Sequence, residues 1–198
     1  MTIVFASANQ NKIREIKAIM PKHITVLGLT DVGITDDIPE TGTTIRENAF
    51  LKAKYVSDFL KSKNQNMPVF ADDSGLEVEA LQGAPGVYSA RYAGVPKSDQ
   101  KNNEKLLREL KDVTKRQARF VTVIAYVQGE EEKYFEGIIQ GTISYEARGN
   151  NGFGYDPLFI PRAYRSTFAE LNAETKNSIS HRALAVKQFI GYLGVGNL

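Results

Sequence analysis

The sequence predicts an α/β fold in which a mixed β-sheet is flanked by helices. In the N-terminal half, strand-like apolar runs alternate with segments of helical periodicity, which is typical of strands connected by helices. The region around 120–147 contains strand-like runs only, which argues against a pure doubly wound parallel sheet. The chain of 198 residues shows no internal repeat and no linker, so we expect a single domain over 1–198.

The expected elements follow in order along the chain. Strands are expected at 2–6, 24–29, 68–71, 76–81, 120–127, 132–147 and 157–160. Helices are expected at 11–20, 44–62, 99–111 and 181–193, where apolar residues recur at helical spacing. The sequence Gly-Glu-Glu-Glu joins 120–127 to 132–147 and predicts a long antiparallel hairpin. Long polar loops lie at 28–43, 82–98 and 148–156, and loops of such length are usually functional.

Composition excludes several classes of protein. The chain has no cysteine, which excludes disulfides, zinc–thiolate sites and thiol nucleophiles. With 25 Lys and Arg against 23 Asp and Glu, the net charge of +2 does not favour a nucleic-acid polymer as partner. The N-terminus lacks the apolar stretch of a signal peptide, and the best apolar run, at 121–127, is strand-sized. We therefore expect a soluble, cytoplasmic protein that does not bind membranes.

The segment ASANQNKIREI (6–16) places a polar loop between a strand and a helix. A helix N-terminus presents unpaired amide N–H groups and a partial positive charge, so this arrangement suits a phosphate. Ser7, Asn9 and Lys12 would add a hydroxyl, an amide and an ammonium group. The Walker A pattern is absent. The alternative is that Ser7 or Asn9 only caps the helix while Lys12 lies in solvent.

Lys52 lies within the apolar stripe of the expected helix 44–62. The other members of this stripe are Ile45, Ala49, Ala53, Val56, Phe59 and Leu60. A lysine in such a stripe either extends its ammonium group to solvent or meets an anion in a cleft. The sequence leaves both possibilities open.

The segment VFADDSG (69–75) runs from a strand directly into two aspartates, Asp72 and Asp73. One interpretation is a tight turn, in which Asp favours the first position and Gly the fourth. The other is a Mg²⁺ site, in which Glu40 supplies a further carboxylate and phosphates supply the remaining ligands. Because side chains alternate along a strand, both aspartates would face one cleft only if the strand carried a bulge.

The segment GNNGFGYDP (149–157) combines glycines with aromatic residues. Glycines let the backbone approach a ligand, and Phe153 or Tyr155 offers a ring on which a flat base can stack. Asp156 could accept hydrogen bonds from such a ligand. The alternative is a turn whose aromatic residue packs against the protein.

The segment TKNSISHRALAVKQFIGYL (175–193) carries cations at the start of an expected helix. Ser180 is expected to cap this helix, which puts His181 and Arg182 in its first turn, with Lys176 just upstream. Cations at this end oppose the helix macrodipole, and such a local conflict tends to mark a functional site.

These cations, the acidic cluster and the glycine-aromatic loop together suit a nucleoside triphosphate with a bound divalent metal ion. The blocks SANQNKIREI, ETGTTIRENAFLKA, FADDSGLEVEALQGAPGVYSARYAG, NGFGYDPLF and SHRALA resemble, in order, the inosine triphosphate pyrophosphatase family over essentially the whole chain. Many members have a glycine before the lysine of the first block, where this chain has Asn11. Asparagine also tolerates a left-handed backbone, so this departure leaves the resemblance intact.

The resemblance implies an elongated structure of two lobes with the site in a central cleft, in a homodimer. It implies an enzyme that hydrolyses dITP, ITP and XTP to the monophosphate and pyrophosphate with Mg²⁺, and so cleanses the nucleotide pool. Asp73 would be the general base and a metal ligand, with Glu40 a further ligand and Asp72 nearby. The residues that would bind the substrate are Ser7, Ala8, Asn9, Gln10, Asn11, Lys12, Lys52, Ser74, Phe153, Gly154, Tyr155, Asp156, Lys176, His181 and Arg182.

Within this set the resemblance divides the roles by segment. Ser7 to Lys12, with Lys52, would hold the triphosphate, and Phe153 to Asp156 would cradle the base. Lys176, His181 and Arg182 would read the 6-oxo edge of hypoxanthine or xanthine, which the amino group of adenine cannot satisfy.

One alternative comes from another functional class, and a second is a related enzyme. A nucleotide sensor that binds without hydrolysis would not need the extra carboxylates Glu40, Asp72 and Asp73. A septum-inhibition-type nucleotide pyrophosphatase would prefer pyrimidine or modified nucleotides, and the Ser-His-Arg block argues against it.

Overall fold

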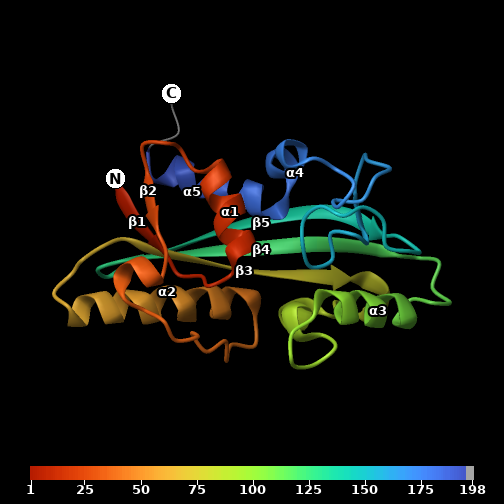
Figure 1. The fold of residues 1–198 in the computed structure, drawn as a ribbon, viewed down its shortest axis with the longest axis horizontal. Helices are drawn as coiled ribbons and strands as arrows, with labels where there is room; N and C mark the ends of the chain where they lie inside the picture. The colour runs from red at the N-terminus through yellow and green to blue at the C-terminus, as the bar shows by residue number, and fades with distance from the viewer. Residues whose placement is uncertain (195–198) are drawn as a thin grey trace. The chain divides into compact units, whose positions relative to one another are not determined.

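The structure, a computed structural model, describes residues 1–194 and contains one six-stranded sheet flanked by helices (Figure 1). The strands are β1 (Thr2–Phe5), β2 (Thr25–Leu27), β3 (Val69–Val78), β4 (Gln117–Gln128), β5 (Glu131–Ile143) and β6 (Phe159–Pro161). The helices are α1 (Gln10–Ile19), α2 (Ile45–Ser62), α3 (Asp99–Glu109), α4 (Ala173–Ile179) and α5 (His181–Tyr192). The strand order is β2-β1-β3-β4-β5-β6. β1 is parallel to β2 and β3, whereas β5 is antiparallel to β6, so the expected mixed α/β sheet is confirmed.

Most of the expected elements are present, with two differences. β4 and β5 are neighbours joined by a tight turn at 129–130, which confirms the expected hairpin. The tight turn considered at 72–75 is wrong, because β3 continues through both aspartates to Val78. The expected strand 76–81 therefore belongs to β3, and its last residues form a short 3-10 helix, Glu79–Leu81. The sequence pattern did not predict α4.

The chain divides into two compact units. Unit 1 consists of residues 1–73 and 122–137 together with the C-terminal segment that begins at Arg182. Unit 2 consists of 74–121 and 138–181. The expectations of one domain over 1–198 and of a central cleft stay predictions.

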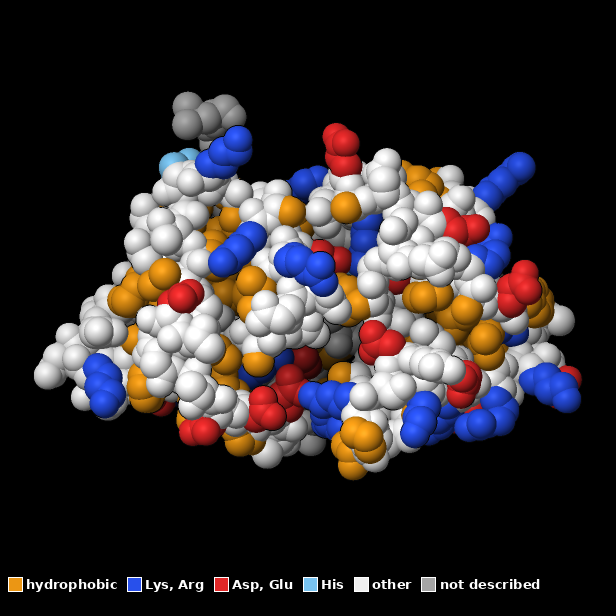
Figure 2. All heavy atoms as spheres, viewed as in Figure 1, with side chains coloured by type: hydrophobic (Ala, Val, Ile, Leu, Met, Phe, Trp, Pro, Cys, Tyr) orange, Lys and Arg blue, Asp and Glu red, His pale blue; other side chains and the backbone are white. Residues whose placement is uncertain are grey.

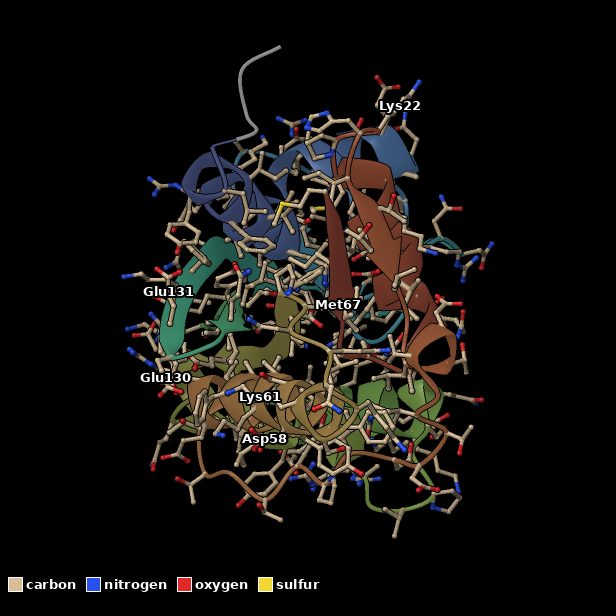
Figure 3. The ribbon with its side chains drawn as sticks, turned by 90° about the vertical axis from the view of Figure 1, so that its left-hand side faces the viewer. Lys22, Asp58, Lys61, Met67, Glu130 and Glu131 are labelled. Carbon is tan, nitrogen blue, oxygen red and sulfur yellow. The ribbon has the colours of Figure 1, made fainter. Side chains whose placement is uncertain are left out.

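In unit 1 the strands carry helices on both faces. α1 and α5 lie on one face and α2 on the other, as Figures 1 and 3 show from two directions. The apolar core on the α1 and α5 side contains Ile3, Phe5, Ile16, Met20, Ile24, Phe70, Ile124, Tyr126, Ala185, Val186 and Phe189. On the other side α2 buries an apolar stripe of Ala49, Ala53, Val56 and Leu60.

The polar side of α2 faces solvent near the β4–β5 turn. Asp58 and Lys61 project from α2, and Glu130 and Glu131 lie at the turn (Figure 3). Lys61 Nζ donates to the carbonyl oxygen of Gly129 at 3.1 Å. This bond joins the C-terminal end of α2 to the hairpin within unit 1.

In unit 2, α3 packs its apolar side against the strands through Leu106, and Leu110 follows at its C-terminal cap. Both leucines join an aromatic cluster in which the rings of Phe120 and Phe159 lie 4.7 Å apart. Phe168 packs against Phe159 at 5.3 Å. This core supports the loop that carries the candidate base-binding residues.

The charged surface and the helices agree with the composition. Figure 2 shows Lys and Arg side chains interspersed with Asp and Glu on the face that it displays. Among residues 1–194, no helix is long and apolar enough to cross a membrane.

Candidate functional site

The two aspartates of β3 contact cations on opposite faces of the unit 1 sheet. Asp72 Oδ1 lies 3.2 Å from Lys12 Nζ of α1, and its Oδ2 accepts from Arg182 Nε of α5 at 2.9 Å. Asp73 Oδ1 lies 3.2 Å from Lys52 Nζ of α2. Because side chains alternate along a continuous strand, no bulge is needed to place the two carboxylates in different surroundings.

Asp72 is the centre of a buried ionic network. Arg182 is 1% exposed, and its Nη1 also donates to the carboxylate of Glu15 on α1. Burial opposes the charge of Asp72, but Lys12 and Arg182 outweigh it and hold the pKa of this carboxyl well below its usual range. For Lys12, burial lowers the pKa although Asp72 opposes the shift. Asp72 therefore stays ionised and keeps both cations in place.

Asp73 lies in a different setting, beside Lys52 and Glu40. Lys52 Nζ donates to Glu40 Oε1 at 3.0 Å and to Asp73 Oδ1 at 3.2 Å, and Lys52 is 7% exposed. Of the two possibilities for Lys52, the structure therefore shows the contact with anions. Burial raises the pKa of Asp73 against the lowering effect of Lys52. Burial opposes the charge of Lys52, but Asp73 and Glu40 outweigh it and raise the Lys52 pKa.

The donor set at Lys52 fits a Mg²⁺ ion that also binds phosphate. The carboxylates of Glu40 and Asp73 already share one cation, so their oxygens converge on a common position. Mg²⁺ is usually held by one or two carboxylates together with substrate phosphates and water, and these two residues supply that number. Within residues 1–194, no group of three or more His, Asp or Glu side chains forms a complete protein-only metal site.

The loop before α2 holds Glu40 near Lys52. Gly42 N donates to Asn48 Oδ1 at 2.8 Å, and a Cβ at Gly42 would lie 2.8 Å from that oxygen and 2.7 Å from Glu47 Cβ. Thr44 and Glu47 form a capping box that fixes the start of α2. The Nδ2 of Asn48 is buried and has no acceptor among residues 1–194.

The loop before α1 combines a helix cap with a buried lysine. Asn9 caps α1 and accepts from the backbone N–H groups of Asn11 and Lys12, while Ser7 Oγ accepts from Asn9 N at 3.2 Å. The capping role expected as an alternative is therefore confirmed for Asn9. Lys12 does not lie in solvent, because its side chain is 14% exposed and faces Asp72. Ala8 and Gln10 are exposed in the same segment.

In unit 2, a second cluster joins the glycine-aromatic loop to α4. Lys176 Nζ forms an ion pair with Asp156 Oδ2 and lies 4.9 Å from the centre of the Phe153 ring. Asp156 Oδ2 also accepts from Phe153 N at 2.8 Å. A Cβ at Gly152 would lie 2.0 Å from the same oxygen, so a side chain there would displace the Asp156 carboxylate. Phe153, Asp156 and Lys176 thus form one compact group.

The two aromatic candidates of this loop differ in burial. Tyr155 is 4% exposed, lies in the apolar core and donates its hydroxyl to the carbonyl oxygen of Ser89 at 2.8 Å. Burial raises the pKa of Tyr155 well above its usual value. Phe153 is partly exposed, so it is the better placed of the two rings to stack on a base.

His181 is also held by the core of unit 2. Its ring stacks on Phe120 with centres 4.5 Å apart and an interplanar angle of 8°. His181 begins α5, as expected, directly after α4 and Ser180. Ser74, the remaining candidate, is partly exposed on β3.

The family of the chain follows from comparison with known proteins. The model of the Ham1 family matches residues 3–192. This chain belongs to the Ham1 family. A dITP/XTP pyrophosphatase of Christiangramia forsetii is 50% identical over 193 residues, which cover 98% of this chain and 99% of the relative. A dITP/XTP pyrophosphatase of Porphyromonas gingivalis is also 50% identical, with 96% of each chain covered.

Solved structures of Ham1 proteins have the same fold. The Ham1 protein of Staphylococcus aureus matches with a TM-score of 0.87 and 44% identity over 100% of both chains. The Ham1 protein of Coxiella burnetii matches with a TM-score of 0.88 and 38% identity over 98% of each. The resemblance seen in the five sequence blocks is thereby confirmed at the level of the family.

Several residues that shape this Ham1 site were not predicted. Glu15, which pairs with Arg182, lies three residues after Lys12 on α1, and that spacing places both on one helix face. Gly42 and Asn48 lie within the ETGTTIRENAFLKA block, but only the folded contacts show that they hold the loop of Glu40.

Proposed function

We propose that this chain is a nucleoside triphosphate pyrophosphatase that hydrolyses dITP, ITP and XTP to the monophosphate and pyrophosphate. The observation that carries the proposal is the Lys52 ammonium group held by Glu40 and Asp73 on the apolar side of α2. A buried cation beside two carboxylates is suited to a polyanion that arrives with a divalent metal ion. The names of the relatives at 50% identity support the same reaction.

In this proposal the unit 1 cluster binds the triphosphate and performs the chemistry. Glu40 and Asp73 would hold Mg²⁺, which when bound neutralises charge on the phosphates. Asp73 would accept a proton from the water that attacks the α-phosphorus. Its raised pKa brings the carboxylate closer to the operating pH, which makes it a stronger base than an ordinary aspartate. Lys12, Lys52 and the loop from Ser7 would stabilise the negative charge that develops on the phosphates.

The unit 2 cluster would bind the base. Phe153 would stack on the purine, the loop to Asp156 would enclose it, and Lys176 and His181 would contact its 6-oxo edge. A donor left unpaired by adenine costs about 1–3 kcal/mol, so a few such contacts produce strong discrimination. Arg182 belongs to unit 1, where Asp72 and Glu15 hold it, so its proposed role in reading the base is supported by the family resemblance alone.

Magnesium dependence, a homodimeric state and a cytoplasmic location belong to the proposal as well. They are what membership in this group of enzymes implies, and the single domain over 1–198 is part of the same expectation. Light scattering on the purified protein measures the oligomeric state directly. Addition of EDTA should abolish turnover, and Mg²⁺ should restore it.

The deciding experiment is a panel of nucleoside triphosphates assayed with Mg²⁺ for pyrophosphate and orthophosphate. We expect pyrophosphate from dITP, ITP and XTP, with ATP and the pyrimidine nucleotides turned over poorly. Binding of ITP without pyrophosphate release would favour a sensor. A preference for pyrimidine or modified nucleotides would favour the septum-inhibition-type pyrophosphatases.

A further inference from the structure

Both backbone polar groups of Gly154 are held by side chains of α3. Gly154 N donates to Asp99 Oδ2 at 2.7 Å, and Asn103 Nδ2 donates to Gly154 O at 3.0 Å. Asp99 and Asn103 are four residues apart, so they lie on the same face of α3. Gly154 lies in a turn and has a φ of +61°. The two α3 side chains thus provide the hydrogen bonds that regular secondary structure would provide elsewhere.

Gly154 lies between the two loop residues of the unit 2 cluster. Phe153 precedes it, and Asp156, which pairs with Lys176, follows two residues later. Phe153 N and Asp156 Oδ2 are themselves joined at 2.8 Å, so the turn is a closed unit. A displacement of Gly154 would therefore move the Phe153 ring and the Asp156 carboxylate together.

The same helix also supports Tyr155 through the segment of residues 83–94. The carbonyl oxygen of Ser89 accepts from the hydroxyl of Tyr155 at 2.8 Å and from Asn102 Nδ2 at 3.3 Å. Asn102 Oδ1 in turn accepts from Ala93 N at 2.8 Å. The segment GAPGVYSARYAG has no direct role in the proposed chemistry. Through these bonds it supports the base-binding loop.

We propose that Asp99 and Asn103 are positioning residues that set nucleobase affinity by fixing Gly154. The inference rests on the proposed function, because it needs Phe153 to Asp156 to bind the base. Neither residue is assigned a contact with the substrate. Asp99 is exposed and Asn103 is partly exposed, whereas α3 is anchored in the core by Leu106. Loss of the two polar side chains should therefore change the loop more than the stability of the fold.

The test compares the double variant Asp99→Ala/Asn103→Ala with the matched control Glu104→Ala. Glu104 is also an exposed acid of α3, and its carboxylate accepts from Gln100 of the same helix at 2.9 Å. Calorimetry measures the affinity for IMP, which carries the base. Competition between ITP and inorganic tripolyphosphate measures the affinity of the phosphate site for a ligand that carries no base. KM and kcat for ITP and the melting temperature complete the set.

We expect the double variant to bind IMP about tenfold more weakly, the scale of one to two hydrogen bonds. Its KM for ITP should rise, while its affinity for tripolyphosphate and its melting temperature should match those of Glu104→Ala. The single variant Asp99→Asn retains an oxygen that accepts from Gly154 N, so it should bind IMP more tightly than the single variant Asp99→Ala, since both keep Asn103.

Two outcomes would overturn the inference. In one, the double variant binds IMP as tightly as the control. In the other, IMP and tripolyphosphate affinity fall together with the melting temperature, which would mark a general structural role. Failure of the proposed function would look different from failure of this inference alone. The wild-type chain would then release no pyrophosphate from ITP and bind no IMP, and the inference would fail as well.

Discussion

The adjacent residues Asp72 and Asp73 should respond in opposite ways to the same substitution. Replacement by Asn removes one negative charge at either position and preserves the shape of the side chain. At Asp72 it leaves Lys12 and Arg182 facing a neutral group in a buried site. At Asp73 it removes a charge that burial already disfavours. We therefore expect Asp72→Asn to destabilise the protein and Asp73→Asn to inactivate it.

The expected cost at Asp72 follows from its buried ion pairs. Removing one partner of a buried pair costs about 3–5 kcal/mol. Arg182 keeps Glu15 as a partner, so the lower end applies. A loss of about 3 kcal/mol lowers the melting temperature of a chain of this size by roughly 6–12 °C. The pKa of Asp72 is lower in the folded state than in the unfolded state. The stability that the ionised Asp72 contributes is therefore complete above a pH of about 3.9 and is lost as the pH falls through the folded-state pKa.

The charge of Asp73 has the opposite effect on the stability of the folded state. Because its folded pKa is raised, the charge destabilises the folded state, and this cost grows as the pH rises from about 3.9 through the folded value. At neutral pH, Asp73→Asn should leave the melting temperature unchanged or raise it. Loss of a general base should lower kcat by about 10²–10⁴-fold.

The assay is thermal unfolding of both variants at neutral pH beside steady-state turnover of ITP with Mg²⁺. The reasoning is refuted if Asp73→Asn is the less stable of the two variants. It is also refuted if Asp73→Asn retains more than about a tenth of wild-type kcat, since that exceeds what the loss of a general base allows.

Three further outcomes are expected. Lys52→Met should raise KM for ITP. It should also move the acidic limb of the kcat–pH profile to higher pH, because Lys52 lowers the pKa of Asp73. An acidic limb at the wild-type pH would contradict this effect of Lys52 on Asp73. Gly42→Ala should weaken activation by Mg²⁺, measured as the Mg²⁺ concentration at half-maximal rate, because a Cβ would lie 2.7 Å from Glu47 Cβ and displace the loop of Glu40; a wild-type Mg²⁺ requirement would show that the loop adapts. His181→Ala should lower kcat/KM for ITP by about tenfold while ATP changes little, as loss of one or two base contacts predicts, whereas an equal loss for both nucleotides would place His181 outside base recognition.

The sequence predicted the elements whose signal is local. Periodicity located α1, α2, α3 and α5 within a few residues, and the apolar runs located the central hairpin. The strand at Asp72 and Asp73 was harder, because Asp-Asp-Ser-Gly is a favourable turn by local rules. Burial between cations on both faces overrides that preference, and it depends on residues far away along the chain.

The sequence indicated which residues are candidates for the site, but it did not predict most of the contacts among them. The lysine in the apolar stripe of α2 left a solvent-facing side chain and a contact with an anion both open, and the structure shows two carboxylates beside it. The depth of Arg182, its bond to Glu15 and the burial of Tyr155 depend on tertiary packing. No pattern in a single sequence reports which of two aromatic rings in a loop turns toward the core.

The aspartate pair also determines how β3 can be aligned in the sheet. Val69, Phe70 and Ala71 are all buried, so their apolar pattern does not distinguish one face from the other. A shift by one residue would turn every side chain to the opposite face. One direction of shift would place Ala71 opposite Arg182, and the other would place Ser74 opposite Lys52, so either shift leaves one cation without its carboxylate. The charged contacts of the two aspartates therefore specify the alignment of β3, which its apolar residues do not. An insertion or deletion of one residue before Asp72 should prevent correct folding as well as catalysis.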